Sequence, residues 1–225
     1  MAVSNSTNFE LDVAEYIEEA FERCGLEVRT GYDLKTAKRS INLMLADWAN
    51  RGLNQWTIET VELTLVQNQQ DYLLGADTID VLSPVVIRQY DGTSNQIDIE
   101  IERMSRGDWL NIPNKEDTGR PIEYFVDRSL TPTIKVWPKP DNTGYKLVYD
   151  RLVRMADADA YTNTMGIPFR FYPCFVAGLA YYIAMKRAPD RIELLKAIYE
   201  EEFDRAAAED RDRASLIITP GRYYS

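Results

Sequence analysis

Carboxylates are the residues of this sequence with the widest chemical range, because two of them at a fixed separation can hydrolyse a glycosidic bond. The chain of 225 residues has 36 Asp and Glu residues and no histidine. The adjacent acids Glu18–Glu19 and Glu200–Glu202 fall on the polar faces of predicted helices, where solvation is the simpler interpretation. Asp157-Ala158-Asp159 lacks the remaining ligands of a calcium loop. We therefore predict no catalytic residue and no metal site.

The absence of histidine excludes several kinds of catalytic site. Ser-His-Asp and Cys-His catalysis, the HExxH zinc site and every histidine-ligated metal are excluded. Cys24 and Cys174 lie inside apolar helical patterns, which favours buried reduced thiols over a disulfide or a nucleophile. The glycines are scattered singly at turns and form no phosphate cradle. We expect no cofactor and no enzymatic activity.

The net charge of -10 argues against non-specific binding of nucleic acid, because the chain would repel phosphate. A basic and aromatic group around one predicted turn comprises Arg103, Arg106, Trp109 and Arg120. We interpret this group as an ion-pair surface between subunits rather than a nucleic-acid platform. The longest apolar stretch, residues 175–185, is shorter than the ~20 residues that cross a bilayer. The first residues lack a secretory signal, so we expect folding in a cytoplasm.

Two helices are predicted near the start of the chain. The first spans residues 8–24, where apolar residues recur on one face and glutamates occupy the other. Thr7 or Asn8 is expected to accept hydrogen bonds from its first free amides. The second helix runs over Thr30–Gly52, and its first residue forms a weaker version of the capping box with Asp33. The basic residues of the second helix lie off its apolar stripe. Its polar face is therefore positively charged, whereas the polar face of the first helix is negatively charged.

Two further helices are predicted near the end of the chain. One begins at Pro168, a favourable first-turn residue, and Pro173 is expected to kink or restart it. The other begins at Pro189, and Ile198 belongs to the face that we expect to point inward. The four helices therefore flank a central segment in which the hydrophobic period is two.

The central segment is predicted to form antiparallel strands joined by short connections, as in a sandwich or barrel-like sheet. The candidate strands are residues 57–65, 79–90, 97–101, 122–127, 133–136 and 146–153. Pro84 indicates an edge or a bulge, because proline cannot donate to a ladder. Residues 104–110 are expected to form a short helical turn.

The last residues of the chain are apolar and aromatic, which is unusual for a frayed end. We expect this tail to dock on a partner, by adding a strand or by similar contacts; packing on its own domain is the other interpretation. The predicted docking residues are Leu216, Ile217, Ile218, Thr219, Pro220, Gly221, Arg222, Tyr223 and Tyr224.

The predicted fold class is α+β: a discontinuous antiparallel α-helical bundle with an inserted antiparallel β domain and an extended C-terminal tail. Residues 1–55 and 166–210 form the helical core in this prediction. Residues 56–165 form the inserted β domain with its linker, and residues 211–225 form the docking tail.

Three ordered groups of residues resemble motifs of bacteriophage head-to-tail adaptor proteins, also called connector, head completion or packaged-DNA-stabilisation proteins of short-tailed phages. The first group is Tyr32–Leu34 with Ser40–Leu53 and Trp56-Thr57, similar to a helix ending in Leu-Asn-x-Met-Leu-x-x-Trp-x-x-x-Gly. The second is Ile134–Asp141 with Tyr145–Tyr149, similar to a strand, a Pro-x-Pro turn and a strand. The third is Ile167-Pro168 with Ala177–Ala184.

The resemblance implies a structural subunit of the virion head–tail junction. Such a subunit assembles as a ring of about twelve copies under the portal protein, around a closed cyclic axis. Its C-terminal segment, matched here by Arg213–Ser225, reaches the portal, and a tail nozzle or tail hub protein is the partner on the other side. Packaged DNA passes through the ring without sequence-specific binding, and the Glu-rich first and last helices are candidates for its carboxylate lining.

Two other functions remain open at this point. A carboxylate-based hydrolase of cell-wall glycan, carried by the phage particle, would need two acids at a fixed separation in a cleft. A small-molecule-responsive regulator that associates through its helices is a third possibility, although the chain has no basic recognition helix.

Overall fold

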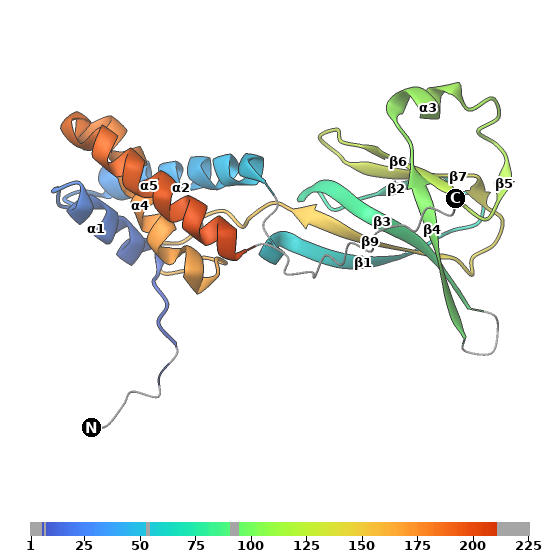
Figure 1. Cartoon of the computed structure of the whole chain (residues 1–225), viewed down its shortest axis with the longest axis horizontal. Helices are drawn as coiled ribbons and strands as arrows, with labels where there is room; N and C mark the ends of the chain where they lie inside the picture. The colour runs from blue at the N-terminus through green and yellow to red at the C-terminus, as the bar shows by residue number, and fades with distance from the viewer. Residues whose placement is uncertain (1–5, 7, 53–54, 91–94, 211–225) are drawn as a thin grey trace, which may run out of the picture. The chain divides into compact units, whose positions relative to one another are not determined.

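The computed structural model describes residues 6, 8–52, 55–90 and 95–210, and the protein has an α+β fold (Figure 1). The described residues divide into two compact units. The helical unit is drawn from the stretches Met1–Trp56 and Ala156–Ser225, and the β unit from Thr57–Met155. The α+β class predicted from the sequence is confirmed.

Four long helices build the helical unit. They are α1 (Val13–Arg23), α2 (Gly31–Arg51), α4 (Tyr172–Arg187) and α5 (Ile192–Glu209), joined to the 3-10 turns η1 (Gln55–Thr57), η2 (Phe169–Phe171) and η3 (Pro189–Arg191). Helix α4 is apolar on nearly all sides and contacts α1, α2 and α5 (Figure 1). A helix with this composition is stable only inside a core, so the other three helices serve to cover α4.

The start of α1 differs from the prediction. The helix begins at Val13 rather than residue 8, and its N-cap is Asp12 instead of Thr7 or Asn8. Asp12 Oδ1 accepts from the Glu15 backbone N–H at 2.8 Å, and Glu15 Oε2 accepts from the Asp12 N–H at 2.9 Å. The Asp12 backbone also forms an isolated β-bridge with Thr164, which holds the preceding chain extended. A capping box and a bridge therefore prevent the earlier start.

Three other local predictions for the helices can be compared with the structure. The Thr30–Asp33 capping box at the start of α2 is confirmed. Pro173 lies in the first turn of α4, directly after η2, so the predicted restart is also confirmed. The inward orientation of Ile198 is wrong: its side chain is 38% exposed, because it lies beside the stripe through which α5 packs on α4.

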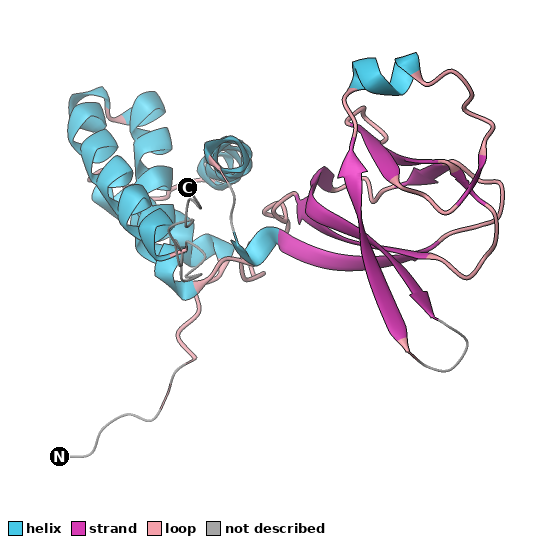
Figure 2. Ribbon diagram, turned by 45° about the vertical axis from the view of Figure 1, so that its right-hand side comes forward, coloured by secondary structure: helices cyan, strands magenta, loops and turns pink. Residues whose placement is uncertain are grey.

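The β unit contains a seven-stranded sheet with the order β1-β9-β3-β4-β6-β7-β2 and a two-stranded sheet, β5-β8. The strands are β1 (Ile58–Thr64), β2 (Asp71–Leu73), β3 (Thr78–Tyr90), β4 (Gln96–Arg103), β5 (Thr118–Gly119), β6 (Glu123–Asp127), β7 (Thr133–Trp137), β8 (Lys139–Pro140) and β9 (Lys146–Val153). Figure 2 shows the large sheet curled rather than flat. Side chains on its inner side form one core: Leu65, Tyr72, Leu74, Val81, Val85, Ile87, Ile101, Tyr124, Val126, Ile134, Val136, Tyr145, Leu147 and Tyr149.

The prediction of a wholly antiparallel region is wrong at two places. Strands β4 and β6 pair in parallel through Glu102–Glu123 and Arg103–Tyr124, and β5 pairs with β8 in parallel. The chain between β4 and β6 passes through the short helix α3 (Arg106–Asn111) and a long loop. A connection of this length lets the second strand return in the same direction as the first, which a tight hairpin cannot do.

Two smaller predictions for the β unit are confirmed. The ladder between β3 and β9 shifts register between Leu82 and Val86, which places a bulge around Pro84. The helical turn after β4 is α3, with Ser105 as N-cap and Asp108 completing a capping box. The short strands β2, β5 and β8 were not predicted, because runs of two or three residues show no alternation.

Both cysteines are buried free thiols, as predicted. Burial raises the pKa of Cys174 to about 12 and also raises the pKa of Cys24, whose thiol donates to the Ala180 carbonyl at 3.2 Å. The reactive thiolate is therefore scarce at both positions at mildly alkaline pH. We expect neither residue to react with iodoacetamide in the folded chain and both to react in denaturant. Mass spectrometry after timed labelling checks this, and labelling of the folded chain at the denatured rate would contradict it.

Candidate assembly surfaces

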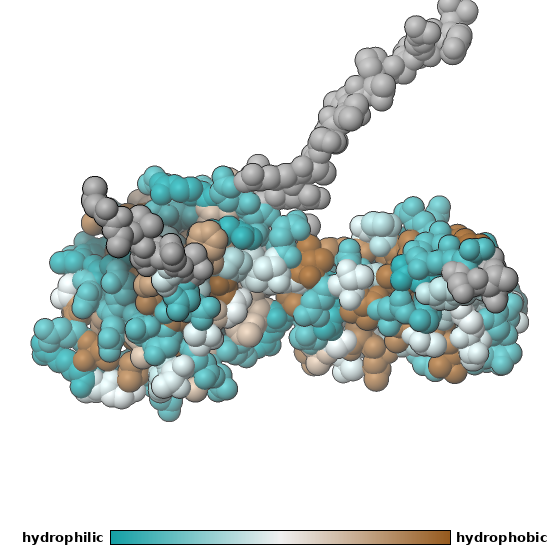
Figure 3. Space-filling view, turned by 90° about the horizontal axis from the view of Figure 1, so that it is seen from below, coloured by the Kyte–Doolittle hydropathy of each residue, from teal (hydrophilic) through white to brown (hydrophobic). Residues whose placement is uncertain are grey.

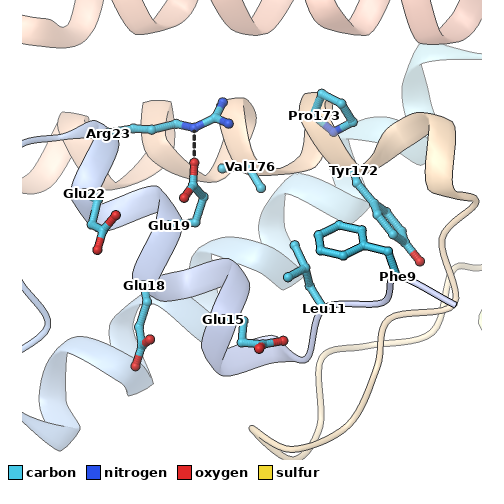
Figure 4. A pocket seen from close by; sticks show the side chains of 10 residues that line it. All are labelled: Phe9, Leu11, Glu15, Glu18, Glu19, Glu22, Arg23, Tyr172, Pro173 and Val176. Atoms are coloured by element: carbon cyan, nitrogen blue, oxygen red, sulfur yellow. Dashed lines mark hydrogen bonds and ion pairs between the residues drawn. The ribbon is translucent and has the colours of Figure 1, made fainter. Parts of the chain in front are cut away.

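A groove lies between α1 and α4, with a volume of about 440 Å³ (Figure 4). Its apolar lining consists of Phe9, Leu11, Tyr172, Pro173 and Val176. The Phe9 side chain is 72% exposed, and its ring centroid lies 6.5 Å from that of Tyr172. The capping box at Asp12 produces this arrangement, because it keeps the residues before α1 extended alongside the start of α4.

Four glutamates of α1 border the groove: Glu15, Glu18, Glu19 and Glu22. Glu15 closes the capping box, and Glu19 pairs with Arg23 at 3.0 Å, as Figure 4 shows. Within the described part of the chain, Glu18 and Glu22 have no cationic partner. Because all four side chains are exposed, the border of this groove is suited to pairing with an external cation.

The glutamates of α5 are already paired within the chain. Arg51 Nη1 donates to Glu200 at 2.7 Å, and Arg205 forms ion pairs with Glu201 at 2.8 Å and Glu202 at 3.1 Å. Arg51 also lies over the Tyr199 ring at 5.0 Å, and its hydrogen bond to Glu200 raises the pKa of the guanidinium. Of the two Glu-rich helices singled out from the sequence, α1 thus presents the less neutralised acidic face.

Three members of the basic and aromatic group predicted in the β unit, Arg103, Arg106 and Trp109, have contacts within the chain. Arg103 donates to Asp80 at 2.8 Å, and Arg106 donates to Asp127 at 2.7 Å. Trp109 is buried and stacks on Phe125 with centroids 5.8 Å apart. Arg103 and Arg106 therefore already have carboxylate partners within their own chain.

Asp210, the last described residue, is held to the helical unit by its carboxylate. This carboxylate is only 5% exposed and accepts from the Gln55 backbone N–H at 2.8 Å and from Arg170 Nη2. Arg170 Nε is buried without a hydrogen-bond partner among the described residues. Nothing in the sequence singled out this contact, because its members are 40 and 155 residues apart. The predicted docking residues, Leu216–Tyr224, lie outside the described residues.

The described surface also carries apolar side chains, and Figure 3 shows them among hydrophilic ones on one face of the molecule. In the β unit, Leu73 of β2 is 72% exposed, and Leu110 and Leu130 are exposed as well. No helix in the described ranges is long and apolar enough to span a membrane. Within the same ranges, no group of three or more acidic or cysteine side chains is placed to hold a metal ion.

Comparison with known proteins finds similarity over most of the chain both in sequence and in structure. A solved chain from the neck of an empty GTA particle covers 99% of this chain and 98% of its own length, with 12% identity and a TM-score of 0.27. No curated protein matches the chain. The family described as SU10 adaptor protein matches residues 11–222, which include nearly all of both units. The chain therefore belongs to the SU10 adaptor protein family, which confirms its resemblance to the head-to-tail adaptors of bacteriophages.

Proposed function

We propose that the protein is a non-enzymatic structural subunit of the virion head–tail junction, made in the host cytoplasm. It forms a ring under the portal protein, links the portal to a tail nozzle or hub protein, and helps to retain and conduct packaged DNA. The observation that carries this proposal is the match to the adaptor family over residues 11–222. The match includes the start of α1, the whole β unit and most of the tail, rather than one isolated motif.

The two units have separate roles in this proposal. The helical unit forms the ring as a discontinuous bundle, because three of its four long helices cover the apolar fourth, α4, and leave charged faces outside. The β unit, inserted between α2 and α4, faces outward or toward the tail. Its exposed Leu73 and Leu130 supply apolar surface for a tail protein.

The acidic character of the chain serves the passage of DNA. A surface rich in unpaired carboxylates repels phosphate, so that DNA slides through the ring instead of adhering to it. The net charge of -10 supports this role.

The C-terminal tail supplies the contact with the portal. Deleting Ser215–Ser225 is expected to abolish portal binding and to leave the helical unit folded, because the internal contacts of Asp210 lie before the deletion. Size-exclusion chromatography with light scattering, on the chain alone and mixed with the portal protein of the same phage, measures binding. Circular dichroism checks the fold.

A tail of the same composition in scrambled order is the matched control. It is expected to fail as the deletion does, which would show that the order of Leu216–Tyr224 matters and not merely its apolar content. Retained portal binding after the deletion would overturn the tail assignment. Failure of the full chain to bind the portal would overturn the adaptor proposal. Lysis of cell walls in a zymogram would favour the glycan hydrolase instead.

A further inference from the structure

Two surfaces of the helical unit are complementary in charge, and they lie on different helices. The first is the groove between α1 and α4, which we call the acidic groove: an apolar floor of Phe9, Leu11, Tyr172, Pro173 and Val176, bordered by Glu18 and Glu22. The second is the outward face of α2, which we call the basic ridge: Tyr32, Lys35, Arg39 and Leu43.

The basic ridge is a continuous line of side chains that the fold leaves uncovered. Its members are three or four residues apart, so they share one face of the helix. The apolar side chains of Tyr32 and Leu43 are 68% and 56% exposed, whereas the opposite face carries buried Ile41, Met44 and Trp48. In the part of the chain that the structure describes, neither Lys35 nor Arg39 has a carboxylate partner.

We propose that the basic ridge of one copy of this chain packs into the acidic groove of the next copy. Glu18 and Glu22 are four residues apart, as are Lys35 and Arg39, so each pair repeats at about 6 Å along its helix. Two opposite charges on each helix can therefore meet their counterparts together. Tyr32 and Leu43, which flank the bases, then cover the apolar floor around Phe9 and Tyr172.

The apolar contacts supply most of the stability of this interface, and the charges select its register and partner. Exposed ion pairs contribute about 0–1 kcal/mol each, but juxtaposed like charges strongly disfavour a wrong partner. The contact is heterologous, because groove and ridge are different surfaces of one copy. Heterologous contacts form a ring when the repeated rotation between copies closes on the first copy, and an open filament when it does not. This inference rests on the proposed function and names the surfaces by which neighbouring adaptor subunits join.

Reversal of charge on each surface tests the proposal in the full chain. The groove variant is Glu18→Lys with Glu22→Lys, and the ridge variant is Lys35→Glu with Arg39→Glu. Each is expected to lose lateral association while single copies still bind the portal through their tails. Native mass spectrometry below saturation is then expected to show portals with scattered numbers of copies, instead of bare portals and full rings. The quadruple variant, with both surfaces reversed, is expected to recover the full ring. A mixture of the two double variants is also expected to recover it, because alternating copies present matched surfaces.

The matched control is Glu193→Lys with Asp204→Lys, which makes the same change of charge at exposed positions of α5 and is expected to keep the ring. Full rings from both double variants would overturn the proposal, as would failure of the quadruple variant to recover.

A direct contact test separates this inference from the proposed function. Carbodiimide joins a carboxylate to an amine only where the two groups touch, and mixing isotope-labelled with unlabelled chains identifies links between copies. We expect an intermolecular link from Lys35 to Glu18 or Glu22, both in concentrated protein alone and on the portal. If the full chain fails to bind the portal, the function fails and the link in concentrated protein still decides the contact. The absence of this link under both conditions would overturn the proposed interface.

Discussion

Replacing Gly178 with alanine is expected to lower the free energy of unfolding of the helical unit by about 1–2 kcal/mol, although alanine is the better helix former. A Cβ atom at this position would lie 2.5 Å from Met44 Sδ and 2.7 Å from Tyr199 Cε2. Both neighbours are fully buried. The glycine thus permits α4 to approach α2 and α5 more closely than any side chain would allow.

Two opposing effects determine the sign of this prediction. Helix propensity favours alanine over glycine by about 1 kcal/mol, and overpacking in a core costs about 1–3 kcal/mol or more. Met44 is flexible and can move its sulfur away. Tyr199 is held more firmly, because it accepts a hydrogen bond from Trp48 and stacks on Tyr181 at 6.0 Å. The steric cost therefore outweighs the gain in propensity.

Thermal unfolding followed by circular dichroism in the helical band measures the effect, with an expected fall in Tm of roughly 5–10 °C. Gly166→Ala is the matched control: Gly166 is exposed in the same unit, and a Cβ there would meet no atom within 4 Å. The control is expected to leave the Tm nearly unchanged. A variant of Gly178 as stable as the control would show that α4 can shift to make room.

Periodicity in the sequence was enough to predict the long helices and most of the longer strands. The apolar stripe of α2 and the capping pair Thr30 and Asp33 are local signals, and the structure confirms them. The start of α1 was mispredicted because Asp12 is selected by its bridge to Thr164, a contact 152 residues away (164 − 12). Local capping signals do not decide the start, because Thr7 with Glu10 has the same capping-box spacing as Asp12 with Glu15.

The candidate surfaces could be predicted only in part. The acidic face of α1 and the opposite charge of α2 were visible as helical patterns. The groove was not, because it requires Phe9 and Leu11 to meet Tyr172 and Val176 across more than 160 residues (172 − 9 = 163). The sequence also gave no sign that Glu200 is neutralised by Arg51 or that Asp210 anchors the start of the tail. These contacts depend on which helices become neighbours in the fold.

The same contacts join the ends of α2 and α5. Arg51 joins the end of α2 to α5 through Glu200, and Asp210 joins the end of α5 to Gln55, just beyond α2. Two separate segments therefore hold Asp210 in place. In the proposed docking of residues 211–225 on the portal, a fixed attachment point reduces the conformational entropy that binding must remove.

Trp48 is a central side chain of the helical unit, and Trp48→Ala is expected to have a larger effect on stability than Gly178→Ala. Trp48 is fully buried, and its ring centroid lies 5.6–5.9 Å from those of Phe171, Phe175 and Phe203. Removing such a side chain costs about 3–5 kcal/mol, through lost transfer energy and the cavity that remains. The helical unit is expected to unfold at a markedly lower denaturant midpoint, while the β unit keeps its own transition.

The hydrogen bond from Trp48 Nε1 to the Tyr199 hydroxyl, 2.7 Å long, contributes separately from the packing, and a double-mutant cycle isolates it. Tyr199→Phe leaves the buried indole N–H without an acceptor, which costs about 1–3 kcal/mol. Trp48→Phe leaves the tyrosine hydroxyl unpaired at a similar cost. The smaller phenylalanine ring also loses part of the packing of the indole. The double variant is expected to lose clearly less than the sum of the two single losses, because no unpaired polar group then remains.

Denaturant unfolding of the four proteins of this cycle measures the coupling. Tyr181→Phe is the control, since it removes a hydroxyl from the neighbouring half-buried ring and is expected to change stability by at most about 0.5 kcal/mol. Additive losses in the cycle would contradict the prediction. They would mean that water reaches the indole N–H after the tyrosine hydroxyl is removed, and that packing alone joins α2 to α5 at Trp48.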